Sequence, residues 1–226
     1  MPFFYYDITY IILIPALILA TFAQFKVSST FNKYSKIPNS KGYTGREVAR
    51  MILDRSGLSN VEVVHVSGQL TDHYDPTKRI IRLSDDVYNV ASISAISVAA
   101  HEVGHAIQHQ EGYTPLKIRT GFAPIASFSS QLAWIIFLLG FFINPNLIQV
   151  GILLFSMTVL FQVITLPVEF NASSRALKQL SNEFITSNEL VGAKEVLRAA
   201  ALTYIASTLV GISQLLRLLL LSRNRD

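Results

Sequence analysis

The sequence contains no cysteine and few charged residues. Without cysteine the chain has no disulfide, no thiol nucleophile and no thiolate metal ligand. Asp, Glu, Lys and Arg make up 15% of its 226 residues, against about 25% in an average soluble domain. Because so few charges cannot cover the surface of a soluble globular protein, the composition indicates an integral membrane protein. It also excludes a disordered chain and a coiled coil.

The charged residues are unevenly distributed along the chain. Three segments contain no Asp, Glu, Lys or Arg: residues 8–25, 120–168 and 199–216. A membrane helix needs about 20 predominantly apolar residues, so the second segment has room for two helices, with a turn at Asn144-Pro145-Asn146. The first segment lacks the basic start and the cleavage site of a signal peptide, which favours an anchor. The predicted spans are residues 8–25, 122–143 and 147–166. A fourth apolar segment, residues 199–221, either crosses the membrane or lies at its interface.

Lysine and arginine residues beside the spans predict the orientation of the chain. Only the acidic Asp7 precedes the first span, whereas the span is followed by Lys26, Lys33, Lys36, Lys41, Arg46 and Arg50. Because basic flanks remain in the cytoplasm, we expect residues 26–120 and 167–198 to be cytoplasmic in a multi-pass protein of the cell membrane. If the fourth segment crosses, Arg223 and Arg225 of the tail would lie outside, against this rule.

The region between the first two spans has the sequence patterns of a small α+β unit. Thr44 and Glu47 match a capping box, which predicts the start of a helix. Residues 61–66 are rich in β-branched side chains and are predicted to form a strand. Residues 69–74 and 78–83 are predicted to pair as a β-hairpin.

The next predicted helix begins at the N-cap Ser84, ends near Gln110 and carries the run His101-Glu102-Val103-Gly104-His105. Histidines four residues apart lie on one helix face, so both imidazoles can bind one tetrahedral zinc ion. Glu102 follows the first ligand, where it can accept a proton from a metal-bound water. In a chain of this composition the motif is expected by chance about 0.004 times, so it indicates a zinc site rather than two unrelated histidines.

A catalytic zinc site of this kind needs a third protein ligand, and three arrangements compete. In metzincins a histidine lies six residues after the second ligand and a glycine three residues after it, but Glu111 and Gln108 occupy these positions. In site-2-type intramembrane proteases the ligand is a downstream Asp, but only Asp226 follows Asp86. In gluzincins a later helix supplies a glutamate, and the candidates are Glu169, Glu183, Glu189 and Glu195.

The predicted topology selects Glu169 as the third ligand, because it directly follows the third span on the same membrane side as His105. The other three glutamates have the pattern of solvated helix residues, and Glu189 forms a capping box with Thr186. One zinc ion per chain, held by His101, His105 and Glu169, is therefore expected.

Four segments carry a family likeness: Leu70-Thr-Asp-His-Tyr-Asp-Pro76, Arg82-Leu-Ser84, Ala100-His-Glu-Val-Gly-His-Ala-Ile-Gln108 and Pro167-Val-Glu-Phe-Asn-Ala-Ser173. Together they resemble the YugP-type membrane-bound neutral zinc metallopeptidases over nearly the whole chain, and this resemblance implies a zinc-dependent peptidase. In similar membrane gluzincins an Asp at the position of Ser173 supports the first histidine ligand. Because serine replaces it here, we expect Asp72, Asp75 or a backbone carbonyl to accept the second N–H of that histidine.

The expected chemistry is hydrolysis of peptide bonds by a zinc-activated water, with the glutamate of the motif as general base. A donor is also needed for the oxyanion that develops on the substrate. His73 and Tyr74 are the first candidates because they lie in a segment that carries the resemblance, and His109 and Arg175 are further ones. The strand at residues 78–83 either pairs with an extended substrate by β-augmentation or is an ordinary core strand.

We therefore expect a mainly α, α+β integral membrane protein with three to four transmembrane helices and a zincin-like cytoplasmic catalytic domain that contains a small sheet. From the N-terminus, its expected parts are a transmembrane anchor, the catalytic region, a transmembrane hairpin, the helix with the third zinc ligand, and the fourth apolar helix with the tail. They cover residues 1–25, 26–120, 121–168, 169–198 and 199–226.

A membrane-bound zinc endopeptidase is the predicted function. Its expected partners are peptide or membrane-protein substrates, the lipid bilayer, and a membrane partner protein or a second copy of the chain. The alternative is a non-catalytic scaffold or partner protein stabilised by zinc, against which the intact Glu102 argues. A transporter or channel has little support, because Arg217 is nearly alone among ionisable residues in the spans. The net charge of +4, without an arginine-rich helix, gives no indication of nucleic-acid binding.

Overall fold

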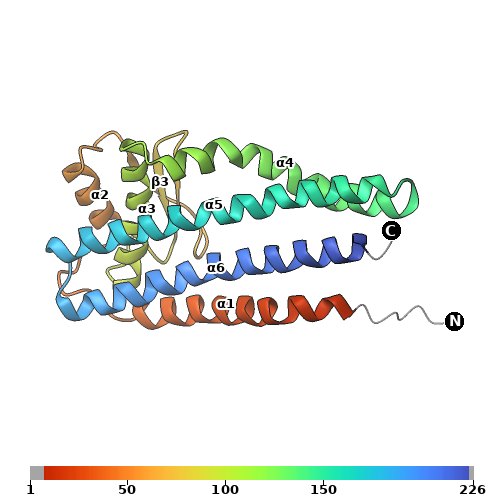
Figure 1. Cartoon of the computed structure of the whole chain (residues 1–226). Helices are drawn as coiled ribbons and strands as arrows, with labels where there is room; N and C mark the ends of the chain where they lie inside the picture. Colours follow the sequence, from red (N-terminus) through yellow and green to blue (C-terminus); the bar gives the residue numbers. More distant parts are fainter. Residues whose placement is uncertain (1–7, 224–226) are drawn as a thin grey trace. The chain divides into compact units, whose positions relative to one another are not determined.

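The computed structural model describes residues 8–223, which form six α-helices, a short 3₁₀ helix and three strands (Figure 1). In chain order these are η1 (Ile8–Ile12), α1 (Leu13–Ser35), α2 (Gly45–Arg55), β1 (Glu62–His65), β2 (His73–Asp75), β3 (Ile80–Leu83), α3 (Ile93–Gln110), α4 (Thr114–Phe142), α5 (Asn146–Glu183) and α6 (Ser187–Arg223). Asp7 and Arg225, which entered the orientation argument, lie outside the described residues.

The chain divides into two compact units. The first, called the apolar-helix unit, comprises Met1–Gln24, Ile118–Thr165 and Thr203–Asp226. The second, called the mixed unit, comprises Phe25–Lys117 and Leu166–Leu202 and contains the whole sheet. Helices α1, α4, α5 and α6 each contribute residues to both units, so neither unit corresponds to one continuous stretch of sequence.

Four helices of the described chain are long and apolar enough to cross a membrane, by length and composition. These candidate spans are Thr9–Ser35, Thr114–Gly140, Asn146–Ser181 and Ser187–Arg223. The predicted turn between the second and third spans is confirmed, since α4 ends at Phe142 and α5 begins at Asn146. The helices are longer than predicted: α5 continues through Pro167 without a break, as membrane helices can. The fourth apolar segment belongs to one long helix, α6.

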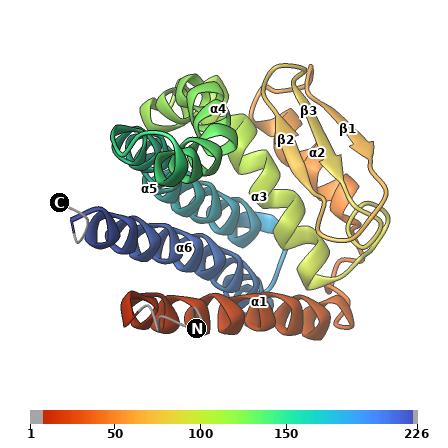
Figure 2. The ribbon, with the colours of Figure 1, turned by 90° about the vertical axis from the view of Figure 1, so that its right-hand side faces the viewer.

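The three strands form one sheet in the order β1-β3-β2 (Figure 2). β3 pairs in parallel with β1 and antiparallel with β2, and the second pairing confirms the predicted hairpin. Because both edges of β3 are already hydrogen-bonded, the strand within residues 78–83 is an ordinary core strand, and the alternative that it pairs with a substrate is wrong. The sheet has its free edges on β1 and β2, and β2 packs on α3.

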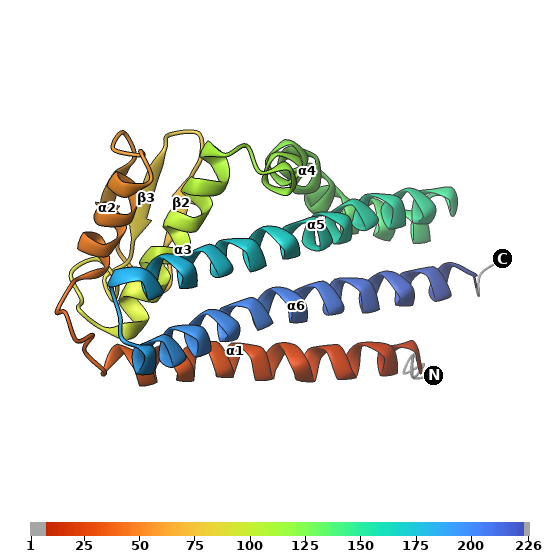
Figure 3. The ribbon, with the colours of Figure 1, turned by 60° about the vertical axis from the view of Figure 1, so that its left-hand side comes forward.

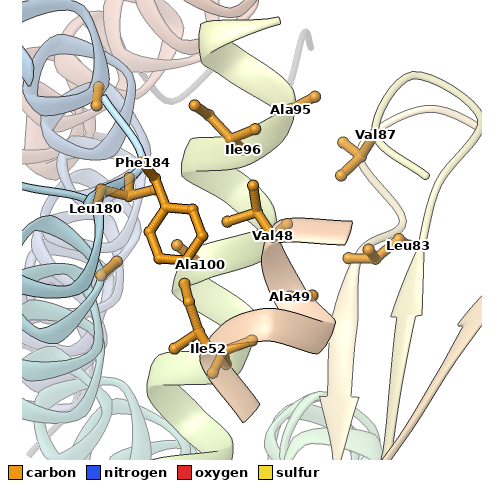
Figure 4. Close-up of a cluster of buried hydrophobic side chains, with 14 of the residues drawn as sticks. Val48, Ala49, Ile52, Leu83, Val87, Ala95, Ile96, Ala100, Leu180 and Phe184 are labelled. Carbon is orange, nitrogen blue, oxygen red and sulfur yellow. The ribbon is translucent and has the colours of Figure 1, made fainter. Parts of the chain in front are cut away.

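A buried hydrophobic cluster joins α2, α3 and the sheet in the mixed unit (Figure 4). Thr44 caps α2 in the predicted capping box with Glu47. The labelled members of the cluster are Val48, Ala49 and Ile52 of α2, Ala95, Ile96 and Ala100 of α3, Leu83, Val87, Leu180 and Phe184. Complete burial of one such large apolar side chain contributes about 1.5–3 kcal/mol, so this cluster fixes the position of α3.

Helix α3 begins later than the sequence pattern predicted. Its N-cap is Ser92, whose hydroxyl accepts a hydrogen bond from the backbone N–H of Ala95 at 3.1 Å. The expected N-cap, Ser84, instead donates its backbone N–H and its hydroxyl to the carboxylate of Asp72, at 2.7 and 2.9 Å. A tertiary contact therefore replaces the local cap, and residues 85–89 form turns rather than helix.

Candidate metal centre

In the mixed unit, α3 lies beside the C-terminal part of α5 (Figure 3). These two helices bring together three side chains that can bind a metal ion. His101 and His105 lie one turn apart on α3, and Glu169 lies on α5. The helices approach closely at Gly104, where a Cβ atom would lie 2.7 Å from the carbonyl oxygen of Ala172. Glycine is needed at this position because no side chain fits between the two backbones.

The ligand atoms of the three residues converge. Oε2 of Glu169 lies 3.2 Å from Nε2 of His101 and 3.6 Å from Nε2 of His105, and the candidate ligand atoms all lie within 4.8 Å of one another. Glu169 is only 2% exposed, and a buried carboxylate needs a compensating positive charge. Two imidazole nitrogens and one carboxylate oxygen are a common protein ligand set of catalytic zinc. The residues therefore fit a zinc ion.

The remaining ring nitrogens of the two histidines also have partners. Nδ1 of His101 lies 3.2 Å from the hydroxyl oxygen of Ser173. Nδ1 of His105 lies 3.0 Å from Oε1 of Gln108. Metal-bound histidines have this arrangement, in which one nitrogen faces the ion and the other is hydrogen-bonded to the protein.

The partner of the first histidine differs from the expected ones. Asp72 accepts hydrogen bonds from Ser84, and Asp75 accepts one from Arg82 at 3.2 Å. The expectation that one of these two carboxylates supports the histidine is therefore wrong. Ser173 itself fills the place of the Asp that the resemblance suggested, although its side chain is shorter.

Glu102 lies on α3 within the same motif and is 7% exposed. Burial raises the pKa of its carboxyl, and this effect outweighs the neighbouring charges of His101 and His105, which lower it. A carboxylate with a raised pKa is a stronger proton acceptor than an ordinary glutamate. The structure thus places a candidate base directly beside the candidate ligands.

The two candidate oxyanion donors on β2 lie on opposite faces of the sheet, because successive side chains of a strand alternate. The hydroxyl of Tyr74 reaches α3, where it lies 2.8 Å from Nδ1 of His109. His73 is exposed, with Nδ1 2.8 Å from the carbonyl oxygen of Thr71 and Nε2 3.3 Å from the guanidinium of Arg82. The structure brings Tyr74, and not His73, to the helix with the metal motif.

The other candidate glutamates have different partners. Glu183 pairs with Arg55 at 2.6 Å, and Glu195 accepts a hydrogen bond from Tyr34 at 2.8 Å. Glu189 accepts hydrogen bonds in the predicted cap at the start of α6. None of the three belongs to the metal-binding group found among the described residues.

Sequence reasoning missed the roles of Gln108 and Asn171. Gln108 of α3 is completely buried and hydrogen-bonded to His105. Asn171 of α5 accepts a hydrogen bond from Gln108. One signal for Gln108 was present: it follows His105 by three residues, and residues at this spacing are neighbours on a helix. Asn171 had no comparable signal, because its contact depends on the packing of two helices distant in sequence.

The four apolar helices and the converging ligands define a membrane-associated protein with a candidate zinc centre. The chain belongs to the family described as "putative neutral zinc metallopeptidase", which matches residues 9–223. It is 55% identical over 213 residues to the "Putative membrane protease YugP" of Bacillus subtilis (strain 168), and the alignment covers 93% of this chain and 95% of that protein. No solved structure matches it. The family predicted from the sequence is confirmed.

Proposed function

We propose that this protein is a membrane-bound endopeptidase that uses one zinc ion per chain, held by His101, His105 and Glu169. The convergence of these ligands beside the buried Glu102 supports the proposal. A structural zinc site is closed by four protein ligands and needs no base, so Glu102 favours an enzyme over a zinc-stabilised scaffold. When bound, zinc would supply a Lewis acid and a water with a pKa of about 7.

Glu102 is the proposed general base. Its carboxylate takes a proton from the attacking water and passes that proton to the nitrogen of the departing amine. Both transfers need a carboxyl group whose pKa is close to the working pH. The burial that raises the pKa of Glu102 moves it in this direction.

Tyr74 is the proposed donor to the developing oxyanion, with His109 as the residue that orients it. Burial raises the pKa of Tyr74, so its hydroxyl keeps its proton at neutral pH and can donate. Polar donors aimed at a developing charge are worth more in a site that excludes water. His73, which is exposed on the other face of the sheet, has no such support.

Extended peptides or segments of membrane proteins are the proposed substrates. Strand β2 is a free edge of the sheet and packs on α3, so it can form backbone hydrogen bonds with an extended chain. The lysine and arginine residues that follow the first span support a cytoplasmic location of this site in the cell membrane. Peptide bonds close to the inner membrane surface are then within reach.

The substitution Glu102→Gln tests this proposal. An amide cannot accept the proton, so cleavage of an unfolded protein such as casein should fall about 10²–10⁴-fold while one zinc ion per chain is retained. Glu62→Gln is the matched control, because Glu62 is exposed at the start of β1, and it should leave cleavage unchanged. Wild-type cleavage by Glu102→Gln would reject this residue as the base.

A further inference from the structure

Gln108 connects His105 to a chain of hydrogen bonds between α3 and α5. Its side chain is completely buried, and its Oε1 lies 3.0 Å from Nδ1 of His105. Its Nε2 donates to the carbonyl oxygen of Val168 at 2.8 Å and to Oδ1 of Asn171 at 2.9 Å. Oδ1 of Asn171 also accepts a hydrogen bond from Nε of Arg175, at 2.7 Å. Both polar atoms of the Gln108 amide, Oε1 and Nε2, are therefore hydrogen-bonded.

The Arg175 end of this chain fixes the direction of every hydrogen bond in it. A guanidinium can only donate, so the Asn171 atom beside it must be the oxygen. That oxygen can bind only donors, so Gln108 must present its NH₂ group there. The Val168 carbonyl, which can only accept, requires the same orientation. The Gln108 oxygen consequently faces His105, whose Nδ1 must carry a hydrogen.

We propose that Gln108 is a positioning residue of the zinc centre, which holds His105 in the tautomer with its hydrogen on Nδ1. A neutral imidazole has one donor nitrogen and one acceptor nitrogen, so this tautomer leaves the lone pair of Nε2 for the metal. Nε2 of His105 lies 3.6 Å from Oε2 of Glu169, on the side where the ligand atoms converge. The inference rests on the zinc site of the proposed function and adds the group that prepares one ligand for the ion.

The two ligand histidines differ in how their tautomers are determined. His101 meets the hydroxyl of Ser173, and a hydroxyl can rotate to donate or accept, so it accommodates either tautomer. Only His105 faces an amide whose orientation other groups fix. The chain of hydrogen bonds that ends on Arg175 is fixed further by an ion pair, in which the guanidinium of Arg175 lies 2.6 Å from the carboxylate of Glu111. His105 is thus the ligand whose orientation is set before the ion binds.

The first test is Gln108→Met in the full-length purified protein, because methionine has a similar length but no comparable hydrogen-bonding groups. The zinc affinity, measured by competition with a chromophoric chelator, should fall about 10–100-fold, as for other residues that orient metal ligands. The visible spectrum of the cobalt-substituted protein should change as well. The thermal stability of the metal-free protein separates this effect from a simple loss of packing. Wild-type affinity and an unchanged cobalt spectrum would overturn the inference.

The second test uses the polarity of the chain and does not depend on whether Gln108→Met folds. Asn171→Asp keeps the oxygen that accepts from both neighbours, so it should bind zinc nearly as tightly as the wild type, whereas Asn171→Leu should bind it more weakly. Gln108→Glu should resemble Gln108→Met, because its carboxylate would face the Val168 oxygen.

Equal weakening by Asn171→Asp and Asn171→Leu would overturn this inference alone, since the polarity of the chain would then be irrelevant. A wild-type protein that binds no zinc would overturn the proposed function together with it. The two failures are therefore distinguishable, because the wild type is measured in the same competition assay as the variants.

Discussion

The two parts of helix α5 have different surroundings. In its first part, residues 146–165, the large apolar side chains of Leu153, Leu160 and Val163 are exposed. In its second part, residues 166–183, five side chains are almost completely buried in the protein. These are Val168, Glu169, Ala172, Ala176 and Leu180. A single unbroken helix therefore presents apolar surface along one stretch and buries a carboxylate along the next.

This difference shows that one helix, α5, combines an apolar surface with a buried polar site. Exposed apolar side chains in such numbers mark a surface that contacts lipid or protein rather than water. The second part could not hold a buried carboxylate unless positively charged or hydrogen-bonding groups surrounded it, and His101 and His105 supply them. The helix continues through Pro167 without a linker between the two parts.

A lysine placed in each part of α5 should have the largest difference in effect between the two parts. Leu153→Lys puts a charge well inside the apolar first part, residues 146–165, and should cost about 2.5–3.5 kcal/mol of membrane insertion. Ser181→Lys lies at the exposed end of the second part and should change stability by less than about 0.5 kcal/mol. The amount of each variant recovered in the membrane fraction measures the difference. Equal losses would contradict the assignment of the first part to lipid.

Gly104→Ala should have the next largest effect, and it acts on the second part alone. The added Cβ would lie 2.7 Å from the Ala172 carbonyl oxygen, so the helices must separate at a cost of about 1–3 kcal/mol. The free energy of unfolding and the zinc affinity should both fall. Gly121→Ala is the control, because nothing lies within 4 Å of its Cβ, and it should be neutral or stabilising. An unaffected Gly104→Ala would show that this close approach is not needed.

Ser173→Ala should have the smallest effect of the three. It removes the hydrogen-bond partner of His101, whose side chain is 13% exposed, so water can replace the lost hydroxyl. The zinc affinity should fall by about 10-fold at most, the low end for such partners, and chelator competition measures it. Ser181→Ala, a serine on the same helix outside the metal group, should have no effect. A larger loss for Ser173→Ala than for Gln108→Met would reverse the proposed ranking of the two histidine partners.

Local patterns predicted the parts of this molecule that depend on neighbouring residues. The capping box of Thr44 and the turn at Asn144-Pro145-Asn146 are set within a few positions of the chain, and both are present as predicted. The pairing of Glu169 with the two histidines was also predictable, because the predicted membrane topology returns the chain to the same side.

Features that depend on distant contacts were not predictable in this way. The residues around Ser84 match the pattern of an N-cap, but Ser84 donates its hydrogen bonds to the carboxylate of Asp72. The N-cap of α3 is Ser92 instead. The central place of β3 results from its parallel pairing with β1, for which the sequence contains no local signal. The role of Gln108 likewise depends on where α5 lies against α3.

The zinc content of Glu169→Ala tests the central claim most directly. The wild type and the control Glu183→Ala, whose glutamate pairs with Arg55 away from the metal group, should each contain one zinc ion per chain after purification. Glu169→Ala should contain almost none and should not cleave casein, although its circular dichroism spectrum remains that of the wild type. One zinc ion per chain in Glu169→Ala would contradict the account, because another residue would then have to be the third ligand.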